Sequence, residues 1–232
     1  MYRWLVLLLL PILLSCIQRG AGSPGAPDPG NAQGYGHAHG RTHMEPGTVQ
    51  ERLARYEDPE RAVWQKPDEV VAALALPADA TVVDLGSGSG YFSVRLARAV
   101  PRGRVIGLDI EPAFVEHLHQ RAKREGLSNL EVRQVPPDDP RLDPATVDLV
   151  LILDVYHHLE NRPVYLGKLR EALRPGGRIA VIDFTMTAGH GPPPKHRLKR
   201  EEVLREAAEA GLTLAREQSI LPEQYFLELE AR

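Results

Sequence analysis

The sequence predicts an α/β fold in which a doubly wound, mostly parallel sheet carries helices on both faces. Short apolar runs alternate with segments of helical periodicity along most of the chain, and this alternation is typical of parallel strands joined by crossover helices. The run between Asp148 and Asp154 is entirely apolar, as expected for a strand that is buried on both faces. With 43% hydrophobic and 25% charged residues, the composition is that of a globular domain.

The elements follow from the chain in order. A helical segment over residues 49–75 comes first, because Val49, Leu53 and Tyr56 repeat at helical spacing and Pro67 can begin a second helix. A further helix is expected between Asn161, which can cap it, and the turn at 175–177. The last two strands alternate apolar and polar residues, which predicts an antiparallel edge. The expected strands span residues 81–85, 105–109, 130–135, 147–155, 178–184, 213–219 and 225–230, and the remaining helices span 92–100, 112–125 and 201–210.

Charge and cysteine content exclude several classes of function. The 28 Lys and Arg residues nearly balance 31 Asp and Glu, so no basic surplus favours a nucleic-acid partner. Cys16 is the single cysteine, which excludes an internal disulfide framework and a zinc site with several thiolates. We expect no metal site in the domain and no obligate protein partner.

Residues 1–15 have the pattern of a secretory signal peptide. Arg3 precedes an apolar run over residues 4–14, which at eleven residues is too short to cross a bilayer as a helix. The sequence Leu13-Leu14-Ser15-Cys16 that follows resembles the lipobox of bacterial lipoproteins. This resemblance implies cleavage before Cys16, acylation of that cysteine, and an exported protein held to a membrane of the bacterial cell envelope, on the periplasmic or outer-surface side. The alternative is an ordinary signal peptidase site with an incidental cysteine.

Residues 16–48 are predicted to be a flexible linker. Twelve of the 32 residues from 17 to 48 are Gly or Pro, and such a segment buries too little apolar surface to offset its chain entropy. His37, His39 and His43 lie within it. They either bind Zn²⁺ or Cu²⁺ or belong to a solvated linker, and the domain proper then spans residues 49–232.

The strand over 81–85 runs into a glycine-rich turn, Gly86-Ser87-Gly88-Ser89-Gly90. A turn of this kind at the start of a helix presents backbone N–H groups to a ligand. Tyr91 stands where a dinucleotide-binding loop requires its third glycine, and no Lys-Ser/Thr pair completes a phosphate-binding loop. Asp109 ends the next strand, 23 residues after Gly86, where a carboxylate can accept both hydroxyl groups of a ribose.

Four segments occur in a fixed order: residues 83–90, 105–110, 148–159 and 173–178. Together they resemble the motifs of class I S-adenosylmethionine-dependent methyltransferases, from about Val82 to the C-terminus. The resemblance implies a Rossmann-like sheet of seven strands, the last of them antiparallel, and S-adenosylmethionine as cofactor. It also implies which residues bind the cofactor: Asp84, Gly86, Ser87, Gly88, Gly90, Asp109 and Ile110 around the first two strands, and Asp138 or Asp139 near the adenine.

Methyl transfer needs alignment of the acceptor and, for some acceptors, a general base. Asp154, Tyr156, His157 and His158 follow the fourth strand, where an acceptor would approach. We predict His157 as base or acceptor-orienting group, with Asp154 beside it, although each imidazole could instead pack against the next helix. The predicted function is methyl transfer to a small molecule. The alternative is a tethered, non-catalytic binding protein, because export separates the chain from cofactor made inside cells.

Overall fold

The computed structural model describes residues 47–232. The predicted signal peptide, Cys16 and the three linker histidines His37, His39 and His43 lie outside the described residues. Within them the chain forms one seven-stranded sheet with strand order β3-β2-β1-β4-β5-β7-β6. The predicted α/β fold is confirmed.

The strands alternate with helices as the sequence predicts. The strands are β1 (Thr81–Leu85), β2 (Arg104–Asp109), β3 (Leu130–Gln134), β4 (Val147–Leu153), β5 (Leu173–Phe184), β6 (Leu212–Gln218) and β7 (Gln224–Ala231). The helices are α1 (Val49–Tyr56), α2 (Arg61–Gln65), α3 (Pro67–Ala73), α4 (Ser93–Ala99), α5 (Pro112–Arg124), α6 (Arg162–Ala172) and α7 (Arg200–Glu209), with short 3₁₀ turns η1 (Tyr156–His158) and η2 (Pro194–His196).

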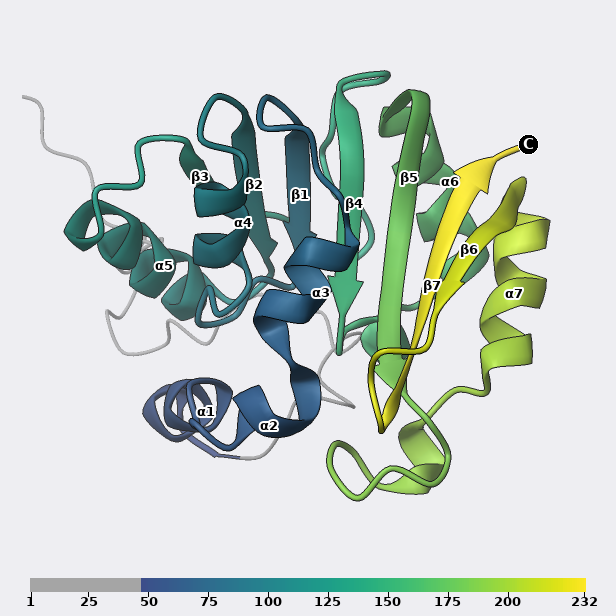
Figure 1. Ribbon diagram of the computed structural model, residues 1–232, viewed down its shortest axis with the longest axis horizontal. Helices are drawn as coiled ribbons and strands as arrows, with labels where there is room; N and C mark the ends of the chain where they lie inside the picture. Colours follow the sequence, from purple (N-terminus) through teal and green to yellow (C-terminus); the bar gives the residue numbers. More distant parts are fainter. Residues whose placement is uncertain (1–46) are drawn as a thin grey trace, which may run out of the picture. The chain divides into compact units, whose positions relative to one another are not determined.

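Strands β1 to β5 run parallel, and β7 lies antiparallel to both β5 and β6, which confirms the predicted antiparallel last strand. The carboxyl ends of the parallel strands therefore share one edge of the sheet. Helices α1 and α2 lie across this edge, at the bottom of Figure 1. Any group that follows β1, β2, β4 or β5 is brought to the same side of the molecule.

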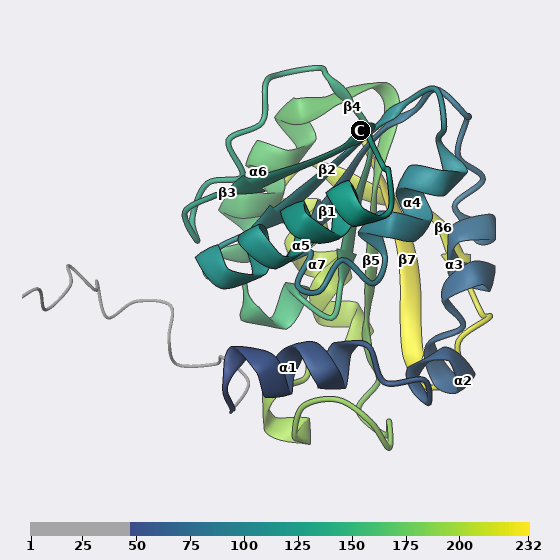
Figure 2. The ribbon, with the colours of Figure 1, turned by 90° about the vertical axis from the view of Figure 1, so that its left-hand side faces the viewer.

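Two apolar cores hold the helices to the sheet, one on each face. Side chains of α3, α4 and α5 pack on one face, and side chains of α6 and α7 pack on the other; Figure 2 shows the two layers on either side of the strands. Neither core includes a residue of α1 or α2. The cores therefore fix the scaffold, and the two helices at the carboxyl edge are attached by other contacts.

Two predicted elements differ from the structure. The helical segment 49–75 is three helices, because Lys66 adopts a left-handed conformation with φ 46° between α2 and α3 and the chain also turns between α1 and α2. Strand β5 begins at Leu173, whereas the sequence placed a turn at 175–177 before the strand. The turn is an irregularity inside the strand, since the β4–β5 register shifts between Val147 and Leu149. Among residues 47–232 no helix is long and apolar enough to span a bilayer.

Candidate functional site

The glycine loop after β1 is shaped by backbone contacts. The N–H groups of Gly86 and Ser87 both donate to the carbonyl oxygen of Leu108 on β2, at 2.8 and 2.9 Å. Gly86 and Gly90 have φ of 72° and 84°, a region that favours glycine. A Cβ would overlap Val155 at Gly86 and Leu118 at Gly90. The loop therefore requires glycine at both positions for conformation and for space.

Asp109 joins β2 to the same loop. Its carboxylate accepts hydrogen bonds from the N–H of Gly88 at 2.8 Å and the N–H of Glu111 at 2.9 Å. Burial raises the pKa of Asp109, and these backbone donors act against the increase. Each carboxylate oxygen accepts one N–H and retains a further lone pair. Asp109 is therefore held rigidly and can still accept hydrogen bonds from a ligand.

Asp84 and Ser87 lie beneath the loop. Asp84 is buried and accepts a hydrogen bond from the hydroxyl of Ser93, and burial raises its pKa to about 6. The Ser87 hydroxyl is buried without a hydrogen-bond partner, beside Gly107 on β2. Both side chains are therefore part of the buried support of the loop.

The other predicted cofactor residues lie at the margin of this region. Ile110 directly follows Asp109 and is 42% exposed, which is unusual for a large apolar side chain here. The Asp138 carbonyl accepts a hydrogen bond from Lys168 of α6 at 2.7 Å, and the Asp139 carboxylate accepts one from the Arg141 N–H at 2.9 Å. The structure thus ties the 138–139 turn to α6, and an adenine contact there stays a prediction.

Asp154, at the end of β4, contacts α2 and β7. Its carboxylate accepts hydrogen bonds from the side-chain amides of Gln65, at 2.8 Å, and Gln224, and Arg61 lies 3.6 Å away. Asp154 has φ 58°, a conformation that Asp adopts more readily than most residues. Burial raises its pKa to about 6, and the charge of Arg61 acts against this.

His157 forms a buried pair with Asp183. Its Nδ1 lies 2.8 and 3.0 Å from the two carboxylate oxygens of Asp183, and its backbone N–H also donates to that carboxylate at 3.2 Å. The two side chains are 4% and 2% exposed. Asp183 orients the imidazole so that Nδ1 faces β5, which leaves Nε2 on the opposite side of the ring.

The turn η1, which carries His157, is fixed by contacts with α6 and α7. The Tyr156 hydroxyl donates to Glu206 of α7 at 2.8 Å. Arg162 donates two hydrogen bonds to the same carboxylate, both at 2.8 Å. Tyr156 is fully buried, so η1 is held to α6 and α7 through one buried carboxylate.

Sequence reasoning missed Asp183, Gln65 and Gln224. Asp183 carried a signal, because it lies near the carboxyl end of a predicted parallel strand, where functional side chains gather. The two glutamines carried none, since their contacts with Asp154 span 89 and 70 residues. Tyr56 was assigned only to a helix face; its ring lies 3.3 Å from where a Cβ on Gly88 would stand.

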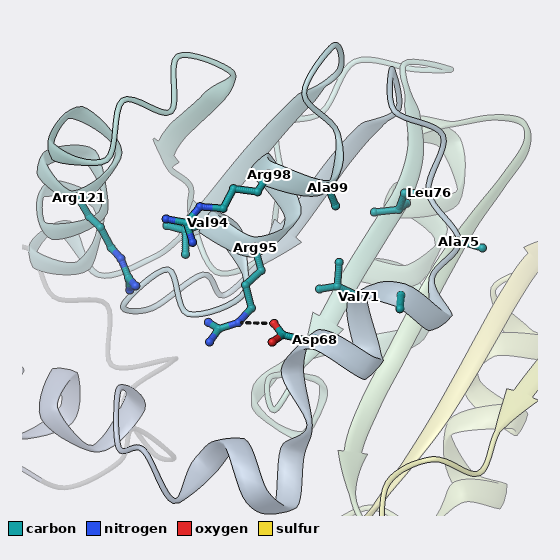
Figure 3. Close-up of a pocket in the computed structure, with 10 residues that line it drawn as sticks. Asp68, Val71, Ala75, Leu76, Val94, Arg95, Arg98, Ala99 and Arg121 are labelled. Carbon is teal, nitrogen blue, oxygen red and sulfur yellow. Dashed lines mark hydrogen bonds and ion pairs between the residues drawn. The ribbon is translucent and has the colours of Figure 1, made fainter.

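Two hollows lie on the surface of the described residues. One, of about 450 Å³, is lined by Thr185, Met186, Lys199, Gln224 and Tyr225 among others, so it adjoins the glutamine that contacts Asp154. The other, of about 640 Å³, lies between α3 and α4 (Figure 3). Its arginines already have acidic partners: Arg95 pairs with Asp68, Arg98 with Glu125, and Arg121 with Glu57 and Glu125.

A model of a methyltransferase domain family matches residues 76–220, which is more than half of the chain. The chain belongs to this methyltransferase family. It carries a class I domain, whose cofactor is S-adenosylmethionine. The ordered motifs of the sequence and the strand order thus agree with the family.

Curated relatives share this domain. The tRNA U34 carboxymethyltransferase of Cellvibrio japonicus is 32% identical over 132 residues, or 56% of this chain and 40% of the relative. The trans-aconitate 2-methyltransferase of an Azoarcus species is 30% identical, covering 57% and 49%. The demethylmenaquinone methyltransferase of Thermus thermophilus is 30% identical, covering 49% of each chain. The chain spans less than half of the length of each of these three relatives.

Solved structures show the same fold. An S-adenosylmethionine-dependent methyltransferase from Aquifex aeolicus has a TM-score of 0.74 at 24% identity, covering 79% of this chain and 98% of that one. The [4+2]-cyclase SpnF has a TM-score of 0.59 at 18% identity, covering 66% and 58%. The fold is thus shared by a methyltransferase and by a protein named for another reaction.

The described residues fit S-adenosylmethionine on two observations. The loop makes a tight turn after β1 in which Gly86, Gly88 and Gly90 all have positive φ, so none of these three positions has a side chain that would cover the backbone of the turn. Asp109 presents a fixed, buried carboxylate beside Gly88, which matches a pair of ribose hydroxyl groups.

Proposed function

We propose that this protein transfers the methyl group of S-adenosylmethionine to a small-molecule acceptor. The observation that carries the proposal is the placement of two groups at one edge of the sheet. The glycine loop with Asp109 follows β1 and β2, and the His157–Asp183 pair follows β4 and ends β5. The glycine loop with Asp109 suits the nucleoside of the methyl donor. The His157–Asp183 pair suits removal of a proton from the methyl acceptor.

In this proposal Gly86, Ser87, Gly88 and Gly90 hold the cofactor through their backbone, above Asp84, and Asp109 accepts the ribose hydroxyls. Ile110 packs against the adenine, and Asp138 or Asp139 approaches its amine. When bound, S-adenosylmethionine supplies an electrophilic methyl group on a sulfonium, so positioning and exclusion of water provide much of the acceleration.

His157 is proposed as the general base. Asp183 accepts from Nδ1 and so fixes the orientation and the tautomer of the imidazole. The buried carboxylate also stabilises the imidazolium that forms. Asp154 remains part of the proposed site as a residue beside the base, and its carboxylate is already bound by two amide groups.

A small-molecule acceptor is proposed from the names of relatives. Two of the relatives are named for methylation of small molecules, trans-aconitate and demethylmenaquinone. A relative named for tRNA makes nucleic acid the contrasting class, which a charge near balance does not favour.

Calorimetry with S-adenosylhomocysteine on the full chain tests the cofactor proposal. We expect binding, and we expect Asp109→Ala to weaken it by about 10- to 100-fold, since a buried charged acceptor is worth roughly 1.5–3 kcal/mol. Asp148→Asn, at the opposite edge of the sheet, is the matched control and should bind normally. No heat of binding at millimolar ligand would refute the proposal.

A tethered, non-catalytic binding protein is the second candidate, because an exported chain would be separated from S-adenosylmethionine that is made inside cells. Transfer of a labelled methyl group from S-adenosylmethionine to cell-envelope and soluble small-molecule fractions separates the two candidates. Label in a small-molecule product supports the enzyme. Binding without transfer to any fraction supports the binding protein.

The sequence also supports a proposal about location: Cys16 is acylated and holds the domain to a membrane of the bacterial cell envelope. Several acyl chains at about 0.8 kcal/mol per buried methylene give stable anchoring. Mass spectrometry of the mature N-terminus from native cells tests it, and an intact Met1 on soluble protein would overturn it.

A further inference from the structure

Helices α1 and α2 are attached to the domain differently from every other helix. They contribute no residue to either apolar core, and the single buried residue of each is polar: Arg52 in α1 and Gln65 in α2. Segments with few buried apolar contacts open at low free-energy cost. Their position over the glycine loop makes any such opening relevant to ligand access.

Helix α3, directly after them, is fixed to the sheet. Arg178 of β5 and Arg216 of β6 donate to the carbonyl oxygens of Leu74 and Ala73 at its C-terminal end. Both arginines are paired with the buried carboxylate of Glu228. Lys66, with φ 46° and ψ 58°, separates this fixed helix from α2. The backbone therefore has a defined bend between a fixed part and a loosely attached part.

Asp154 makes a polar contact between α2 and the sheet, beside an aromatic contact in which the rings of Trp64 in α2 and Phe184 of β5 lie 5.7 Å apart. Gln65 donates to its carboxylate at 2.8 Å and to the side-chain carbonyl of Gln224 at 3.1 Å. Gln224 donates to the other carboxylate oxygen. Arg61 lies 3.6 Å from it and also donates to the Tyr56 carbonyl at 2.8 Å. One carboxylate thus binds α2 directly and, through Arg61, the end of α1.

Opening at Lys66 would uncover the glycine loop. Tyr56 lies against Gly88. Glu57, just after α1, accepts from the Ser89 hydroxyl at 2.6 Å and from Arg121 at 2.5 Å. These contacts cross from the cover to the loop and to α5, and the Glu57–Arg121 pair keeps partial solvent exposure.

We propose that α1 and α2 form a hinged cover over the glycine loop, and that Asp154 is the latch that holds it closed. Asp154 is then a positioning residue for the cover. The hinge is at Lys66. Opening releases the side chains of Arg61 and Gln65 from Asp154 and separates the Trp64 ring from Phe184.

The latch has a definite response to pH. Burial in the closed cover raises the pKa of Asp154 to about 6, from an ordinary value of 3.8 in an open, solvated state. The closed cover therefore binds the proton more tightly, and closure is favoured as pH falls through 6 and weakened as pH rises. The charged and titratable groups that face Asp154 are Arg61 of α2, Asp183 of β5 and His157 of η1; its neighbour from β7, Gln224, is neutral.

Hydrogen exchange of the unliganded full chain tests the proposal, with each amide rate divided by its intrinsic rate at the same pH. Between pH 7 and pH 5, protection of the amides at 61–66 should rise about tenfold, the change expected for one group of pKa near 6. In Asp154→Asn this rise should disappear. Asn tolerates the left-handed backbone at 154.

Gln65→Met keeps the length of the side chain and removes both donated hydrogen bonds. It should lower protection at 61–66 at both pH values and leave α6 unchanged. Asp148→Asn is the matched carboxylate control and should keep the tenfold rise. The proposal is overturned if Asp154→Asn keeps the wild-type pH response, or if Gln65→Met leaves the protection of α2 unchanged. Because no ligand is used, failure of methyl transfer would not affect this result.

Discussion

The glycine loop after β1 and the His157–Asp183 pair after β4 lie at the same edge of the sheet, but different kinds of interaction hold them in place. The loop is held by main-chain hydrogen bonds from Gly86, Ser87 and Gly88. The pair is made of two side chains, His157 of η1 and Asp183 of β5, that meet in a buried contact. A substitution in the loop should first change the packing and the backbone conformation. A substitution in the pair should first change the protonation and the charge of the site.

This difference separates stability from chemistry. Residues of the loop should affect folding and cofactor binding together, because the same glycines shape the turn and the surface. Asp183 should affect the reaction more than the affinity for cofactor. Three measurements can break or sharpen that contrast.

Gly90→Ala should have the largest effect. The new Cβ would overlap Leu118, which is fully buried and also packs toward Gly107. We expect a loss of about 3 kcal/mol in the free energy of unfolding, from overpacking of about 1–3 kcal/mol and a left-handed backbone penalty of about 1–2 kcal/mol. Urea denaturation of the full chain measures it.

Gly126→Ala is the matched control for this prediction. Gly126 also has a positive φ, of 67°, but nothing lies within 4 Å of its Cβ position. It should lose only the backbone part, about 1 kcal/mol. Equal losses for the two variants would show that space around the loop is unimportant.

Asp183→Asn should lower kcat for methyl transfer by about 100-fold, or about 2.7 kcal/mol, within the usual range for loss of an oriented base. The Kd for S-adenosylhomocysteine should stay within about twofold of the wild type, since Asp183 contacts no residue of the glycine loop among the hydrogen bonds of residues 47–232. Initial rates of label transfer and calorimetry measure the two quantities. An equal loss in kcat and in cofactor affinity would remove the distinction between the two groups.

The smallest effect concerns pH and Asp84. Burial raises the pKa of Asp84 to about 6, against 3.8 for an exposed carboxyl, so the folded state holds its proton more tightly than the unfolded state. Its contribution to stability is complete below about pH 4 and is lost as pH rises through 6, which amounts to about 1 kcal/mol between pH 5 and pH 7.

Asp84→Asn should remove this part of the pH profile of the free energy of unfolding, measured by urea denaturation at both pH values. It should leave the pH response of hydrogen exchange in α2 intact, because Asp154 controls that response. If Asp84→Asn removed both the pH dependence of unfolding and the pH response of hydrogen exchange in α2, the glycine loop and the cover would behave as one unit.

Much of the scaffold was predictable from the sequence. The strand that ends at Leu85, the turn at 86–90 and the strand that ends in Asp109 all lie between residues 81 and 109. Their pattern of apolar runs and glycines indicates local conformation directly. The helix start at Pro67 was predicted from that proline and is confirmed by α3, whereas the division of the preceding residues into α1 and α2 was not predicted. The start of β5 at Leu173 was hidden by Pro175, Gly176 and Gly177, which the sheet accommodates as an irregularity.

The sequence by itself determined the α/β fold, the glycine loop and the position of Asp109, because hydrophobic periodicity and glycine placement act over short stretches of chain. Only the tertiary structure decided that His157 faces Asp183, 26 residues away, and that Asp154 receives Gln65 and Gln224, 89 and 70 residues away. Hydrophobic periodicity along the sequence predicts whether a side chain is buried. Which buried side chains meet depends on strand order and register, and these are set by the packing of the whole domain.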